Sequence, residues 1–155
     1  MSQRKYQPAR LFTIEQANAM LPLVRAITTD LATVASDVVE RRNRLQFLTA
    51  GREFKPGDPY AEELAQTESE IQKDAARLQE YVEELRELGV EPKGAMDGLV
   101  DFPAMLDGQL VFLCWKLGEP EVMHWHPLQA GFAGRQSLVA GTVAGDDEPG
   151  DSFEL

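Results

Sequence analysis

Two long stretches of this sequence carry mostly apolar residues at helical spacing, in alternating steps of three and four or in steps of seven, and this pattern constrains the fold most strongly. In the first stretch the repeat is kept by Ile14, Ala17, Leu21, Val24, Thr28, Leu31, Ala35, Val38, Arg42 and Leu45. In the second stretch, Leu64, Ile71, Leu78 and Leu85 repeat at intervals of seven, and Ala61, Ala75 and Val82 fill the accompanying positions. A period near 3.5 is typical of helices that pack along a continuous seam. The sequence therefore predicts an antiparallel helical hairpin over residues 13–89, similar to a coiled coil.

Signals for helix ends flank both stretches. Thr13 begins a capping box, and Asp58-Pro59 suit the N-cap and first position of a second helix. Gly89 suits the left-handed residue that ends a helix. Pro22 interrupts the first seam, so the first helix either kinks there or is split into two.

A single hairpin cannot cover its own apolar seam on every side. Either the C-terminal part of the chain or a second hairpin from another subunit must complete the burial. We therefore expect a homodimer that associates through its helical hairpin.

The C-terminal half predicts three strands, over Leu99–Ala104, Gln109–Leu117 and Glu121–His126. Asp107-Gly108 is a strong two-residue hairpin turn, and Gly118-Glu119 can form the second. The expected fold class is α+β, with the long antiparallel hairpin packed against a small three-stranded antiparallel meander.

Two-residue turns would also determine which side chains share a face of the sheet. With that register, Leu113 pairs with His124, and both histidines lie on the face opposite Asp101 and Cys114. Both faces are largely apolar, so we expect helices on one and either the 128–140 segment or a partner on the other.

The expected organisation has three parts. These are an N-terminal arm (1–12), one α+β domain (13–140) and an acidic disordered tail (141–155). Within the domain, the hairpin covers 13–89, the meander 98–127 and a wrapping segment 128–140.

The chain is acidic, with a formal net charge of -11, which argues against nucleic acid or an anionic membrane as a partner. Residues 59–88 hold nine acids and three bases, and residues 141–155 hold five acids and no base. This acidic helix or tail could bind a basic protein partner. Cys114 is the only cysteine and no signal peptide or spanning segment is visible, so we expect a cytoplasmic location.

The only two histidines, His124 and His126, are two residues apart on the third predicted strand, where their side chains share a face. Two imidazoles at this spacing, with Glu119 as a carboxylate, form a candidate divalent-metal site. This pattern supports an alternative function as a metal-dependent, hydrolase-like enzyme. The competing interpretation is a pair of partly buried histidines that are hydrogen-bonded for structural reasons.

Asp101 lies between apolar residues of a predicted strand, so its carboxylate needs a cation or several donors. Arg135 is the only basic residue after Lys116 and could provide it. Asp101 and Arg135 then either form a structural ion pair, or Arg135 binds an anion or substrate while Asp101 and Glu119 orient the Arg135 side chain. Cys114, in an apolar run, is expected to be a small buried side chain.

Several motifs together resemble a bacterial domain-of-unknown-function family, number twenty-two hundred and three, over most of residues 10–138. They are Phe12–Asn18, Gly98–Pro103, Leu113–Glu119, Trp125-His126 and Gly131–Arg135. The resemblance implies a family signature of Asp101, Cys114, Trp115, Glu119, His126 and Arg135, in which His124 is a freer position. The family is uncharacterised, so the resemblance implies no activity.

The sequence thus favours an uncharacterised intracellular binding or interaction module that dimerises through its hairpin. Its candidate small-ligand or anion site comprises Asp101, Trp115, Glu119, His126 and Arg135. No complete catalytic constellation is visible, so the sequence leaves open whether the protein is an enzyme.

Overall fold

The computed structural model describes residues 6–138, so the expected tail at 141–155 lies outside the described residues. The helices are α1 (Ile14–Thr49) and α2 (Pro59–Glu87), followed by β1 (Glu91–Gly94), β2 (Leu99–Leu106), β3 (Gln109–Lys116), β4 (His124–Pro127), the short 3-10 helix η1 (Phe132–Gly134) and β5 (Gln136–Ser137). The predicted α+β architecture, a long helical hairpin followed by an antiparallel sheet, is confirmed. The described helices include none that is both long and apolar enough to cross a membrane.

The helix ends follow from the residues that cap them. The Thr13 hydroxyl accepts a hydrogen bond from the Gln16 N–H, which completes the predicted capping box. α1 continues through Pro22 as one helix, so Pro22 does not split it. At the end of α2, Gly89 adopts a φ of 89° and the Val90 N–H bonds the Leu85 carbonyl, a Schellman-type ending.

The sheet has five strands in the order β1-β2-β3-β4-β5, and every neighbouring pair is antiparallel. Three strands were predicted, so the predicted strand number was wrong. β1 contains Pro92, Gly94 and a register irregularity, so its sequence does not show the alternation of apolar and polar residues from which strands are predicted. β5 is only two residues long, too short for any periodicity.

The register between β2 and β3 is as predicted, with Leu99 opposite Lys116. The register between β3 and β4 differs by one residue, because Leu113 pairs with Trp125 rather than with His124. The Glu119 N–H bonds the Lys116 carbonyl, so the turn is centred one residue earlier than predicted, and residues 117–123 connect the strands. This one-residue difference places His124 and His126 on the same face as Asp101 and Cys114, which corrects the predicted arrangement.

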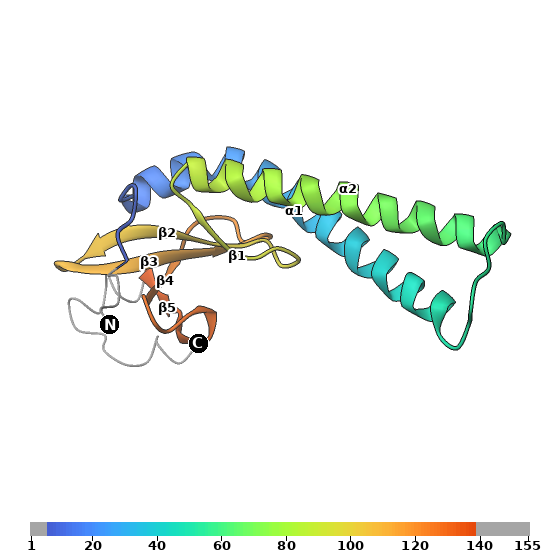
Figure 1. Cartoon of the computed structure of the whole chain (residues 1–155). Coiled ribbons are helices and arrows are strands. Elements are labelled where there is room, and N and C mark those ends of the chain that lie inside the picture. The colour runs from blue at the N-terminus through green and yellow to red at the C-terminus, as the bar shows by residue number, and fades with distance from the viewer. Residues whose placement is uncertain (1–5, 139–155) are drawn as a thin grey trace, which may run out of the picture.

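The two helices cover one face of the sheet, and the segment after β4 covers the other (Figure 1). The helix-side core joins α1 and α2 to apolar side chains of β2 and β3, including Val100, Phe102, Leu113 and Trp115. On the far side, η1 and β5 fold back so that β5 pairs with β4. The sheet is therefore the middle of three layers, and its far face is available for a site.

Beyond the sheet, α1 and α2 extend together and then diverge toward the loop that joins them (Figure 1). A small apolar cluster of Val34, Val38 and Ile71 packs between them. Farther out the contacts become ionic, because Arg41 pairs with Asp74 and Glu70. The outer part of the hairpin is thus held by ion pairs together with a small apolar cluster, against which Leu45 also packs.

Candidate functional site

A cavity of about 320 Å³ lies on the face of the sheet that is turned away from the helices. Its lining comes from four strands, β1 to β4, and from the segment after β4: Lys93, Leu99, Asp101, Phe112, His126, Leu128, Gln129, Ala130, Gly131 and Phe132. Asp101 and His126 are both 2% exposed, so they lie at the bottom of this cavity. A polar pair at the bottom of an otherwise largely apolar pocket is typical of ligand sites.

Asp101 and His126 are hydrogen-bonded to each other. The His126 Nε2 lies 3.0 Å from the Asp101 Oδ2, and the His126 Nδ1 lies 2.7 Å from the Pro127 carbonyl oxygen. Because a carbonyl oxygen can only accept, Nδ1 carries a proton and donates it. One further proton is then shared between Nε2 and the carboxylate.

The surroundings of Asp101 disfavour its charged form. Burial raises the pKa of this carboxyl above its ordinary value, and the positive charges of His126 and Lys93 offset the rise only in part. Its second oxygen, Oδ1, is buried and has no hydrogen-bond partner within residues 6–138. A buried carboxylate oxygen without such a partner is unusual in folded proteins, and the neighbouring Cys114 thiol also interacts with this carboxyl group.

Cys114 lies directly opposite Asp101 in the sheet and is fully buried. Ligand atoms of Asp101, Cys114 and His126 all lie within 4.8 Å of one another. Burial, followed by the nearby Asp101 charge, raises the pKa of the Cys114 thiol to about 12. With no cation bound, Cys114 is therefore protonated at neutral pH and is a poor nucleophile.

A second polar group lies beside the first and contains Glu119, Arg135 and His124. The Arg135 guanidinium makes two short contacts with the Glu119 carboxylate, at 2.8 and 2.9 Å. The same guanidinium lies 2.8 Å from the His124 Nδ1, which therefore accepts. These contacts hold the segment containing η1 and β5 against β3 and β4.

The pKa values of this second group reflect the strong ion pair. Burial alone would raise the pKa of Glu119, but hydrogen bonds from Arg135 and from the Lys116 N–H, with the Arg135 charge, lower it overall. Burial and the Arg135 charge both lower the pKa of His124. Glu119 is thus charged and His124 neutral at pH 7.

The candidate residues lie in three different parts of the structure: the cavity, the ion pair beside it, and the core on the helix side of the sheet. Asp101 and His126 meet in the cavity, whereas Glu119 and Arg135 pair with each other outside its lining. Trp115 lies on the opposite face in the helix-side core, and its Nε1–H donates to the Glu119 carbonyl at 3.0 Å. The predicted metal ligands His124 and His126 share a face of the sheet, but only His126 lines the cavity.

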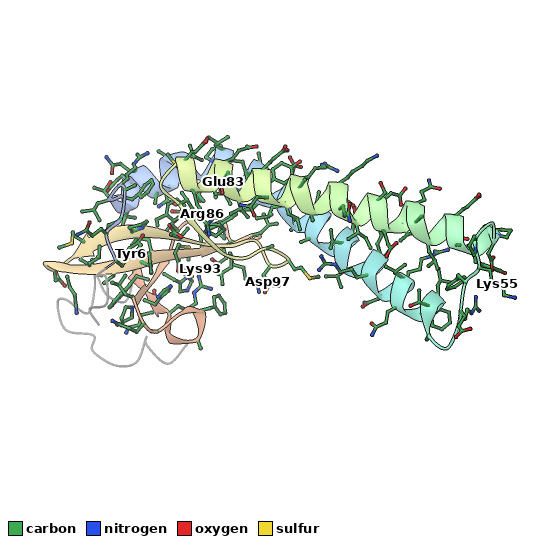
Figure 2. The ribbon with its side chains drawn as sticks, viewed as in Figure 1. Tyr6, Lys55, Glu83, Arg86, Lys93 and Asp97 are labelled. Carbon is green, nitrogen blue, oxygen red and sulfur yellow. The ribbon has the colours of Figure 1, made fainter. Side chains whose placement is uncertain are left out.

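Sequence reasoning missed Lys93, Phe112 and Phe132. The Lys93 Nζ lies 5.0 Å from the centre of the Phe112 ring, and Tyr6 packs on the same ring at 5.5 Å. Figure 2 shows Lys93 beside the sheet and Tyr6 near the same end of the molecule. Phe132 belongs to the quoted Gly131–Arg135 motif and could have been found there, whereas Lys93 lies on an unpredicted strand and gave no signal.

A comparison with protein families matches residues 10–138 to the model described as "Uncharacterized conserved protein (DUF2203)". Searches of curated proteins and of solved structures give no match to this chain. The match covers both helices, all five strands and every candidate site residue. The chain therefore belongs to the DUF2203 family of uncharacterized conserved proteins.

Proposed function

We propose that this protein is a binding module whose cavity takes a small organic anion. The observation that carries the proposal is the cavity itself, of about 320 Å³, with a hydrogen-bonding pair at its bottom and Lys93 in its lining. Pockets for small molecules are typically about 300–1,000 Å³ and combine apolar walls with a few polar groups. The cavity is at the small end of this range, which favours a compact ligand.

The residues around the cavity suggest the chemistry of the ligand. Lys93 is exposed and makes no ion pair within residues 6–138, so its ammonium group is free to pair with a carboxylate. Phe112 and Phe132 provide aromatic walls for a ring or a short apolar body. The Asp101–His126 pair can exchange hydrogen bonds with a polar group that reaches the bottom of the cavity.

Replacing Lys93 by glutamine should weaken binding of benzoate, used as a simple aromatic anion, by about two- to fivefold, the size expected for an exposed ion pair. Titration followed by amide chemical shifts should move Phe112, His126 and Gly131. Lys55→Gln is the matched control, because Lys55 lies at the far loop of the hairpin (Figure 2). Shifts confined to other residues, or equal effects of the two variants, would contradict the proposal.

We also propose that the protein dimerises through its hairpin. The diverging ends of α1 and α2 leave a cavity of about 350 Å³ lined by polar residues from both helices. On α1, Phe47 is 79% exposed and Val39 is 42% exposed. A second hairpin would cover these apolar side chains, which a monomer leaves in water.

The double variant Val39→Glu/Phe47→Glu should convert the dimer into a monomer, because two buried carboxylates would face the partner. Sedimentation at micromolar concentration measures the change. Leu23→Glu is the matched control, since Leu23 is 50% exposed on the same helix but lies in its N-terminal part, away from the loop that joins the helices. A wild-type protein that sediments as a monomer would refute the dimer.

A further inference from the structure

We infer that Asp101, Cys114 and His126 form a site for a divalent transition-metal ion, with Zn²⁺ as the best match. The three residues come from β2, β3 and β4, which are neighbours in the sheet. All three are buried, and their ligand atoms lie within 4.8 Å of one another. Two ligands of a tetrahedral zinc ion lie about 3.3–3.8 Å apart, so small side-chain movements would complete the site.

The kinds of donor atom determine which ion suits the site. One sulfur, one imidazole nitrogen and one carboxylate oxygen match Zn²⁺, whereas Mg²⁺ and Ca²⁺ prefer oxygen ligands throughout. Three protein ligands are also the usual number in zinc sites that keep a position open for water or a ligand. The site therefore belongs to the class that binds an exchangeable molecule.

The surroundings of His126 provide independent support. Its Nδ1–H donates to the Pro127 carbonyl at 2.7 Å, which leaves Nε2 directed toward Asp101. Metal-binding histidines almost always donate their other ring N–H to a carbonyl or carboxylate in this way. The ring is thus already held in the tautomer and orientation that a metal needs.

Asp101 provides the second independent observation. Its side chain is buried, yet Oδ1 has no hydrogen-bond partner within residues 6–138. A bound cation would neutralise the carboxylate and satisfy its oxygens. Beside His126, the Cys114 thiol is the polar group that interacts with this carboxylate, and it is itself one of the three proposed ligands.

The cavity supplies a route to the site and room for a fourth ligand. Asp101 and His126 line it, so an ion bound between them would face the open space. Binding through the Cys114 sulfur would release the thiol proton to solvent, and the proton shared by His126 and Asp101 would leave with it. The bound ion then replaces two protons at the bottom of the cavity.

This ligand set differs from the one expected from the sequence, because His124 and Glu119 are held by Arg135. His124 therefore serves as the control for loss of a neighbouring side chain that is not one of the three proposed ligands. The metal site lies at the bottom of the same cavity as the proposed organic-anion site, but its three ligands do not include Lys93. Lys93→Gln should weaken benzoate binding and leave metal content unchanged.

The test uses full-length protein without a histidine tag, stripped with a chelator and titrated with Zn²⁺ or Co²⁺. We expect one ion per chain, and for Co²⁺ a near-ultraviolet thiolate charge-transfer band. Because Cys114 is the only cysteine, such a band assigns the ligand. X-ray absorption on the zinc-loaded wild type should show one sulfur neighbour, and this measurement needs no variant.

Cys114→Ser and Asp101→Asn should each lower Zn²⁺ affinity by at least about 100-fold, since loss of an outer-shell partner alone costs 10–100-fold. His124→Gln should retain both the affinity and the charge-transfer band. Circular dichroism establishes that each variant is folded. Absence of stoichiometric binding, a metal shell without sulfur, or equal binding by a folded Cys114→Ser protein would overturn the site.

Discussion

Replacing Trp115 by alanine should lower the free energy of unfolding by about 3–5 kcal/mol, the usual cost of deleting a large aromatic side chain from a core. Trp115 is fully buried on the helix side of the sheet. Its Nε1–H holds the Glu119 carbonyl, and the Arg25 guanidinium lies 5.7 Å from its ring centre. The substitution would therefore leave a cavity and also release the loop that follows β3.

Urea unfolding followed by circular dichroism measures this loss. Trp115→Phe keeps most of the apolar volume but cannot donate to Glu119, so it should cost clearly less than alanine. Trp125→Ala is a second comparison, because Trp125 is only partly buried at the edge of the same core. If Trp115→Ala changed stability by less than about 1 kcal/mol, Trp115 would have no such role in the core.

The elements that could be predicted from the sequence depend on short-range signals. The capping box at Thr13, the N-cap at Asp58 and the glycine at position 89 all act within one turn of helix. The β2–β3 register also follows locally, because Asp107 and Gly108 both adopt positive φ in a two-residue turn. Short-range signals were therefore sufficient to predict the helical hairpin and the pairing of the two central strands, β2 and β3.

The β3–β4 register depends on contacts between distant residues. The Val122 N–H donates to the Asn18 Oδ1 at 2.7 Å, so part of the connection is held by α1 rather than by a tight turn. No local signal in the sequence shows this contact. The resulting one-residue shift brings His126 to Asp101 and Cys114, so the candidate residues were identified but their grouping was not.

Replacing Arg135 by methionine should lower the free energy of unfolding by about 2–4 kcal/mol at pH 7, because it leaves a partly buried carboxylate without its cation. The side chain of Arg135 is 14% exposed and that of Glu119 is 25% exposed. Arg86→Met is the matched control. The Arg86–Glu83 pair lies on the surface of α2 (Figure 2), where loss of an ion pair should cost less than about 1 kcal/mol.

The stability difference between wild type and Arg135→Met should also shrink in acid. In the folded wild type, the pKa of Glu119 lies below its ordinary value of 4.5. The stabilisation from the ion pair is therefore present above pH 4.5 and is lost as the pH falls through the lower, folded value. In the variant, His124 loses the Arg135 charge that helps to lower its pKa, so it can protonate beside Glu119 and reduce the difference further. Chemical unfolding from pH 7 to pH 3 measures both effects, and a difference that stayed constant across this range would show that the Glu119–Arg135 pair does not hold the β5 segment.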